Sequence, residues 1–189
     1  MKLVTILVLL LALLIVLKLF IPQISKGMVF IKGKDGIFYK VRKSDDMYET
    51  VNTLSIMRNK CFILIKHALE TKDSRAERLN NWTGNLEEVI PRYEGEAAYS
   101  INKGETIGVC VHTKSGMKED KNTMFFVIMH ELAHVMCKNY AHDDDFWSAF
   151  EFLIKIAVEN DLYDYEDFDN HSKKYCGHKI NFTPYKKND

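Results

Sequence analysis

The chain opens with a long, almost uninterrupted apolar run. Leu3 to Ile21 reads LVTILVLLLALLIVLKLFI, and only Thr5 and Lys18 break it. A helix over this run spans about 28 Å, close to the hydrocarbon thickness of a bilayer. Lys18 lies near its end, where the side chain can extend to the lipid headgroups, and Pro22 stops the helix. The pattern predicts a transmembrane helix.

A cleaved signal peptide is the alternative to an anchor. Its apolar core would be unusually long, and the sequence PQISK after the run offers no small-x-small cleavage site. We therefore expect residues 1–26 to form a transmembrane anchor with its flank, and residues 27–189 to form the folded domain. Lysines at 26, 32 and 34 outnumber the Lys2 that precedes the run. The positive-inside rule thus favours a single-pass protein with a cytosolic C-terminal domain.

After residue 27 the apolar positions follow the periods of strands and helices, with turn residues between them. Asp35-Gly36 is a strong hairpin turn, and aspartates stand where helices should begin. The pattern predicts, in chain order, a hairpin over Met28–Arg42, a helix from Asp45 or Asp46 to Glu70, a short helix near Arg75–Trp82, a hairpin of strands Ala97–Ile101 and Thr106–Thr113, a helix from Asn122 or Thr123 to Lys138, a helix from Asp144 to Asn160, and thirty irregular residues. This mixture predicts an α+β domain.

Charge and cysteine content narrow the possible partners. The chain has 26 Lys and Arg against 26 Asp and Glu. Proteins that hold nucleic acid through phosphates need a basic surface, so no direct nucleic-acid binding is expected. The four cysteines, at 61, 110, 137 and 176, form no C-x-x-C pair. We expect reduced, mostly buried thiols rather than a disulfide framework or a cysteine zinc knuckle.

The most apolar helix of the domain carries three ionisable groups. Between Met124 and Cys137, every other residue is Met, Phe, Val, Ile, Leu or Ala, so the helix should be largely buried. Buried glutamate and histidine carry a desolvation cost unless a partner compensates them. His130 and His134 share one helical face and can reach one cation, while Glu131 can approach a metal-bound water. In this H-E-x-x-H pattern Zn²⁺ lowers the pKa of its water to about 7, and the glutamate takes the proton.

A third histidine, His142, follows eight positions after the second. Asn139 can adopt the left-handed conformation that ends a helix, and such a turn brings His142 back toward the first two histidines. Because catalytic zinc has three protein ligands plus water, we predict all three histidines as zinc ligands and Glu131 as the general base. Of the aspartates at 143–145, one should cap the next helix, and another can orient a ligand imidazole.

Residues 130–147, HELAHVMCKNYAHDDDFW, resemble the H-E-L-x-H…H-x-x-x-F-W signature of the SprT/WLM group of zinc metallopeptidases. The chain is most similar to small WLM-like proteins of large DNA viruses, also in INKGETIGVCV and YCGHKINFTP. The likeness covers most of 28–185 and is strong over 99–150. It implies a zincin-like domain with a small antiparallel sheet, zinc on the three histidines, and Phe146 and Trp147 packed beneath the site. For a viral protein, the anchor would lie in a host or virion membrane.

Three functions remain open at this point. The first is a membrane-anchored zinc metallopeptidase that acts on a protein or peptide and contacts the bilayer through residues 3–21. The second is an inactive binding module in which zinc only holds helices together, with Cys110 or Cys176 completing its coordination. The third is a zinc hydrolase of an RNA backbone, which the lack of a basic surface disfavours, or of a formyl group. Related cellular proteases cut DNA-crosslinked proteins or act near ubiquitin-like modifiers, but the sequence lacks the segments for either role.

Two further interpretations concern the surroundings of the site. The strand Thr106–Thr113 either forms the rim of a substrate cleft or is an ordinary hairpin strand. Gly108 within it either permits a close backbone approach or marks a bulge. Four other potential ligands follow no spacing rule, and structural roles are expected for them: His112, His171, Cys176 and His178.

Overall fold

The computed structural model of the chain describes residues 27–91 and 96–187. The transmembrane helix predicted over residues 3–21 lies outside this part of the chain. Within the described ranges, no helix combines the length and apolar character needed to cross a bilayer. The described residues form a mixed α+β fold, as the sequence predicts.

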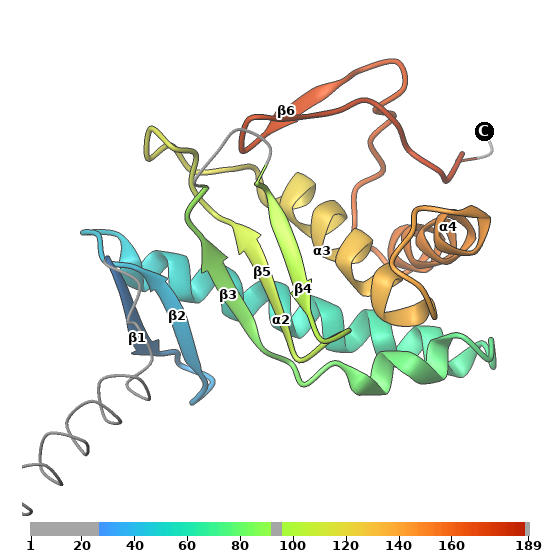
Figure 1. The fold of residues 1–189 in the computed structure, drawn as a ribbon, viewed down its shortest axis with the longest axis horizontal. Helices are drawn as coiled ribbons and strands as arrows, with labels where there is room; N and C mark the ends of the chain where they lie inside the picture. The colour runs from blue at the N-terminus through green and yellow to red at the C-terminus, as the bar shows by residue number, and fades with distance from the viewer. Residues whose placement is uncertain (1–26, 92–95, 188–189) are drawn as a thin grey trace, which may run out of the picture.

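The elements follow the predicted order, with three strands added (Figure 1). The helices are α2 (Met47–Glu70), the short 3-10 helix η1 (Ala76–Asn81), α3 (Lys121–Met136) and α4 (Asp144–Glu159). The strands are β1 (Met28–Lys32), β2 (Phe38–Arg42), β3 (Leu86–Val89), β4 (Ala98–Ile101), β5 (Thr106–Cys110), β6 (Lys173–Tyr175) and β7 (His178–Ile180). Strands β3, β6 and β7 were not expected from the sequence.

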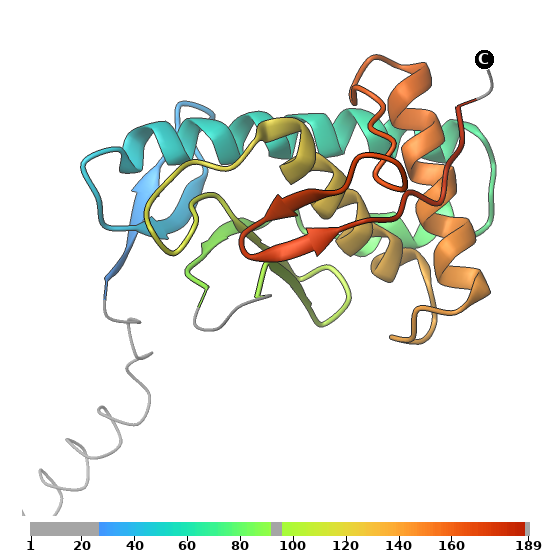
Figure 2. The same cartoon turned by 90° about the horizontal axis from the view of Figure 1, so that it is seen from above.

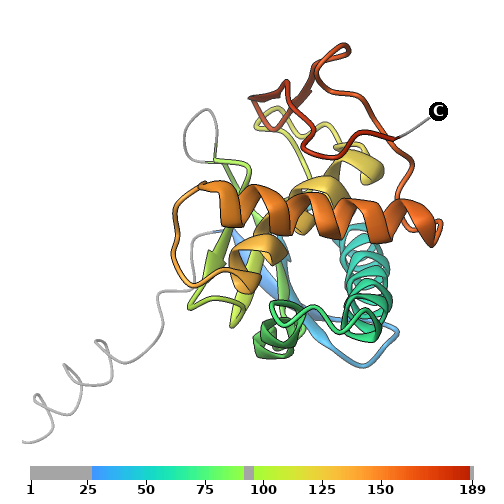
Figure 3. The same cartoon turned by 90° about the vertical axis from the view of Figure 1, so that its right-hand side faces the viewer.

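The central sheet has the order β3-β5-β4. Strand β5 pairs antiparallel with β4 and parallel with β3, so the expectation of a purely antiparallel sheet is wrong. Helix α3 packs against β4 and β5, and α2 packs against β3 (Figure 1). Helix α4 packs on α3 and runs across α2, which Figure 3 shows end-on. The buried α3 is therefore enclosed between the sheet and the other two helices.

Helix α3 begins earlier and ends earlier than the sequence predicts. The Asp120 carboxylate accepts a hydrogen bond from the Thr123 amide at 2.8 Å and one from the Thr123 hydroxyl at 2.7 Å. Asp120 is therefore the cap, and the expectation of Asn122 or Thr123 in that role is wrong. At the other end, Cys137 leaves the helical conformation, so the helix stops before Lys138. Apart from His130, His134 and its first two residues, nearly all of α3 is buried, as its composition requires.

The C-terminal thirty residues are not irregular throughout. Strands β6 and β7 pair antiparallel, and seen from above this hairpin passes over α3 (Figure 2). The Tyr175 hydroxyl is buried and donates to the carbonyl of Cys110 at the end of β5. The hairpin was missed because its three-residue strands carry exposed lysines and show no apolar alternation.

A disulfide joins Cys110 of β5 to Cys176 in the turn of the C-terminal hairpin, with 6.4 Å between their Cα atoms. The expectation of four reduced thiols is therefore wrong for this pair, whereas Cys61 and Cys137 are free and buried. The two bonded cysteines are 66 residues apart in the sequence. No local spacing could reveal the pairing, because only the folded hairpin brings them together.

Candidate metal centre

Helix α3 carries His130, Glu131 and His134 within little more than one turn. The ring centroids of the two histidines are 5.0 Å apart, as expected for positions one helical turn apart. Both imidazoles are half-buried, while the Glu131 side chain is 8% exposed. Polar groups of this size on a buried helix need a compensating partner.

The loop between α3 and α4 returns His142 to the first two histidines. Its Nε2 atom lies 3.1 Å from Nε2 of His134 and 3.0 Å from Nε2 of His130. A tetrahedral zinc ion with Zn–N bonds of about 2.0–2.1 Å separates its ligand nitrogens by about 3.3 Å. The donor set and its spacing therefore fit zinc after a small outward relaxation, and the three imidazoles form a group that can hold a metal ion.

Phe146 supports this cluster from below. Its ring is fully buried, and its centroid lies 4.4–4.8 Å from all three imidazole rings. Trp147 is different, since its half-buried ring stands beside His142 and faces a neighbouring cleft. The packing that the resemblance implies beneath the site thus holds for Phe146, whereas Trp147 lies at the side.

Burial sets the protonation of the site. It lowers the pKa of His130 to about 3 and that of His134 to about 4, with further lowering from the neighbouring imidazoles. Burial also raises the pKa of Glu131 to about 7. At neutral pH the two histidines are therefore in the neutral form that binds metal, and Glu131 lies close to the pH at which a carboxyl group can both take and give a proton.

Of the three aspartates after His142, Asp143 has the capping role, and the Asp145 carboxylate lies 3.8 Å from the Arg75 guanidinium group. Asp143 accepts a hydrogen bond from the Phe146 amide at 3.1 Å and is the N-cap of α4, as predicted. Its other oxygen accepts from the side-chain amide of Asn139 at 2.7 Å, which ties the loop to the helix start. The buried Nδ1 atom of His134 has no hydrogen-bond partner. The alternative in which an aspartate orients that imidazole is therefore not what the structure shows.

Lys103, in the turn between β4 and β5, holds the loop that carries His142. Its ammonium group donates to the carbonyls of Cys137 and Asn139, both at 2.7 Å, and lies 4.3 Å from the centroid of the Tyr140 ring. These two carbonyls follow the last residue of α3, so the lysine ties the turn between β4 and β5 to the start of the loop. Sequence reasoning missed Lys103, because nothing local to the turn indicates a partner 34 residues away.

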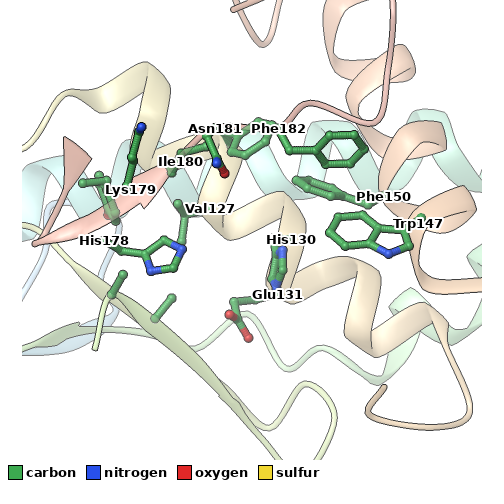
Figure 4. Close-up of a pocket in the computed structure, with 14 residues that line it drawn as sticks. Val127, His130, Glu131, Trp147, Phe150, His178, Lys179, Ile180, Asn181 and Phe182 are labelled. Atoms are coloured by element: carbon green, nitrogen blue, oxygen red, sulfur yellow. The ribbon is translucent and has the colours of Figure 1, made fainter. Parts of the chain in front are cut away.

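A cleft of about 280 Å³ adjoins the metal-binding cluster (Figure 4). One wall carries His130 and Glu131 from α3, and the opposite wall is the C-terminal hairpin with His178. Of the four histidine and cysteine residues expected to be structural, His178 alone lines this cleft. A second, smaller cavity on the other side of Glu131 is lined by Lys103 and Tyr140. Glu131 therefore borders open space on two sides.

The strand Thr106–Thr113 does not form the rim of this cleft. The strand within it, β5, is paired on both sides, since it lies between β3 and β4 among the described residues. Ala97 and Ala98, at the start of β4, line the cleft instead. Gly108 marks no bulge, since its register with both neighbours is continuous. A side chain there would collide with the ring of Tyr99, so the glycine permits a close approach.

The remaining candidates have structural roles or lie apart. His112 is 3% exposed, and its two ring nitrogens lie 2.8 Å from Glu88 and 2.9 Å from Asp46. This contact explains why a glutamate is buried in the unexpected strand β3. The hydrogen bond that the Ser44 hydroxyl donates to the Asp46 carboxylate, together with the hydrogen bond from His112, lowers the pKa of Asp46 to about 2. Cys176 is bonded to Cys110, and His171 is exposed.

Comparison with known sequences gives viral relatives. An uncharacterized protein of Acanthamoeba polyphaga mimivirus is 36% identical over 81 residues, which are 42% of this chain and 41% of that protein. An uncharacterized protein of Invertebrate iridescent virus 3 is 38% identical over 38% of this chain and 45% of its own length. An uncharacterized protein of Invertebrate iridescent virus 6 is 34% identical over 52% of this chain and 54% of its own length. The chain thus spans about half or less of the curated relatives it matches. No family model matches the chain.

Among solved structures, the chain is similar to Wss1 from Saccharomyces cerevisiae. The crystal structure of Wss1 superposes with a TM-score of 0.52 and 19% identity, covering 65% of this chain and 90% of that chain. A Wss1 mutant gives the same TM-score and identity, with 92% of that chain covered. The domain therefore has a mixed α+β fold similar to the WLM domain of Wss1. The fold is thus the one that the sequence resemblance to the SprT/WLM group implies.

Proposed function

We propose that the chain is a zinc-dependent metallopeptidase in which His130, His134 and His142 hold the metal and Glu131 is the general base. The observation that carries the proposal is the convergence of three imidazoles, one ring nitrogen of each lying within 4.8 Å of the others, beside a buried carboxyl group. The fold similarity to the WLM domain of Wss1 supports it. Protein or peptide chains are the proposed substrates.

The proposed chemistry divides between the metal and the chain. When bound, zinc supplies Lewis acidity, which acidifies a water molecule and polarises a carbonyl group. Glu131 receives the proton of the attacking water and passes it to the leaving amine, a transfer that suits a carboxyl group whose pKa burial raises to about 7. We place an extended substrate alongside the start of β4, because Ala97 and Ala98 line the cleft beside Glu131.

The alternative of a structural zinc module is less well supported. Such a site prefers a fourth protein ligand, and the sequence offered Cys110 or Cys176 for that place. Both sulfurs are engaged in a disulfide. The metal-binding group formed by the described residues contains the three histidines alone. Three ligands leave a coordination position for water, as hydrolysis needs. The same disulfide removes Cys110 as the cysteine ligand that a formyl-group hydrolase would want.

Peptide cleavage by the purified full-length chain tests this proposal. We expect the zinc-loaded protein in mild detergent to cleave an unbiased peptide library, and a zinc chelator to stop the cleavage until zinc is added back. Cut sites are identified by mass spectrometry, and bound zinc is measured by elemental analysis. Stoichiometric zinc without any cleavage would favour the structural module, and cleavage that survives complete zinc removal would contradict the metal chemistry.

We also propose that residues 3–21 anchor the domain in a membrane, on the grounds of their length and apolar sequence. We expect the full-length chain to stay with membranes after alkaline carbonate extraction, and its release would contradict the anchor. The flanking lysines favour a cytosolic domain, whereas the Cys110–Cys176 disulfide would persist better in an oxidising compartment. Protease protection in sealed vesicles decides between these two orientations.

A further inference from the structure

The cleft beside Glu131 has an apolar interior that the proposed chemistry does not use. Its floor consists of Phe126 and Phe150, which belong to the core and are 4% and 2% exposed. Ile180, from the C-terminal hairpin, adds a further apolar side chain. Among the described residues that line the cleft, Glu131 is the one carboxylate, and the other interior side chains are mainly apolar.

Two aromatic rings at the mouth of the cleft are left open to solvent. Trp147 of α4 is half-buried, and Phe182, just after β7, is 45% exposed. Their rings meet edge-to-face with centroids 5.2 Å apart. Figure 4 shows both residues among those that line the cleft. An exposed aromatic pair next to a proposed catalytic group favours an apolar ligand, because burying both rings removes water from them.

Phe182 is held in this place by a fixed piece of chain. On one side, the hairpin is tied to β5 by the Cys110–Cys176 disulfide. On the other side, Thr183 is fully buried, and its hydroxyl donates to the carbonyl of Glu166 at 3.0 Å while its amide donates to Asp169 at 3.0 Å. The exposure of Phe182 is therefore a feature of an anchored segment and not of a loose terminus.

The size of the cleft suits one side chain. A dry cavity of about 150 Å³ accepts a benzene ring, and this cleft has about 280 Å³. It is open to solvent at the aromatic rim and continuous with His130 and Glu131, so a peptide whose carbonyl group lies at the metal can place an adjoining side chain in it. Lys179 of the hairpin also lines the cleft, and its side chain is exposed, whereas Phe126 and Phe150 are buried.

We propose that this cleft is a specificity pocket, with Phe182 and Trp147 as its recognition surface, that takes a large apolar side chain of the substrate residue next to the scissile bond. The inference rests on the proposed peptidase function, and it adds the class of substrate. An aromatic or long aliphatic residue gains contact with both rings, whereas alanine leaves the pocket filled with water.

Binding to the metal-free full-length chain tests the pocket without catalysis. The probes are the pentapeptides Ala-Ala-Phe-Ala-Ala and Ala-Ala-Ala-Ala-Ala, followed by tryptophan fluorescence, to which Trp147 in the cleft contributes. We expect the Phe peptide to bind about tenfold tighter or more, and Phe182→Ala to remove this preference. The matched control is Phe38→Ala, since Phe38 is 63% exposed on β2, and it should leave the preference intact.

Cleavage by the zinc-loaded chain gives the second readout. We expect cut sites enriched in Phe, Tyr, Leu or Met at one position beside the scissile bond, and Phe182→Ala to lower kcat/KM for the Phe peptide about tenfold with unchanged zinc content. Three results would each overturn the pocket. The first is equal binding of both peptides, and the second is a preference for the Phe peptide that survives Phe182→Ala. The third is self-association of the chain that Phe182→Ala abolishes. Binding preference without any cleavage would support the pocket and count against the peptidase.

Discussion

Replacing Glu131 by glutamine should abolish peptide hydrolysis while the chain keeps its zinc. Glutamine has nearly the shape of glutamate but cannot take a proton from water, and the loss of such a general base typically costs 10²–10⁴ in rate, about two to four orders of magnitude. The metal should remain, because the three imidazoles and not Glu131 are close enough together to hold it. Peptide turnover and zinc content are measured on the same preparation.

The matched control for this variant is Glu151→Gln, which changes an exposed glutamate of α4 outside the cluster and should leave turnover unchanged. A Glu131→Gln protein that still cleaves at the wild-type rate would show that the glutamate is not the base. Loss of both zinc and activity would instead make Glu131 a ligand. Either result would redirect the mechanism without changing the fold.

The same variant should alter stability in a pH-dependent way when metal is removed. Burial raises the pKa of Glu131 from 4.5 to about 7, so the folded state binds its proton more tightly than the unfolded chain does. The stability that this proton supplies is present below pH 4.5 and is lost as the pH rises through 7. Glutamine carries no charge to desolvate. The metal-free Glu131→Gln protein should therefore be more stable than wild type at pH 8, with a smaller difference at pH 5, as measured by chemical denaturation.

Replacing His142 by alanine should remove zinc with little damage to the metal-free fold. His142 is exposed on a loop, so its loss leaves no cavity in the core, unlike a change in the half-buried His130. Mutation of a residue that only hydrogen-bonds to a zinc ligand typically lowers the zinc affinity about 10–100-fold. Loss of a ligand itself should therefore lower the zinc affinity more than about 100-fold. Zinc titration by calorimetry measures this difference directly.

Zinc should also raise the thermal stability of wild type and not that of the His142→Ala variant. A ligand that binds only the folded state stabilises it by about 4 kcal/mol when present at 1,000 times its dissociation constant. The matched control is His171→Ala, which removes an exposed histidine away from the cluster and should respond to zinc as wild type does. Unchanged zinc affinity in His142→Ala would place the third ligand elsewhere, with His178 across the cleft as the next candidate.

Much of the fold was predictable because its rules are local. The apolar faces of α2 and α4 are set by side chains three and four positions apart. Asp46 and Asp143 stand at their N-cap positions, and the Asp143 side chain accepts the capping hydrogen bond of α4. The hairpins at Asp35-Gly36 and around Gly104 follow from turn residues that accept positive φ angles. Strand β3 escaped prediction because it is short and contains two glutamates. One of them, Glu88, becomes acceptable only when His112 and Arg42 reach it from other strands or loops.

The sequence by itself determined which residues of α3 share the proposed site. His130, Glu131 and His134 belong to one helix, so the period of that helix places them together whatever surrounds it. Only the tertiary structure decided that Lys103 holds the loop of His142 and that the Cys110–Cys176 disulfide fixes the hairpin that forms one wall of the cleft. The physical reason is distance along the chain: contacts between segments tens of residues apart depend on how whole helices and strands pack, and no local spacing encodes them.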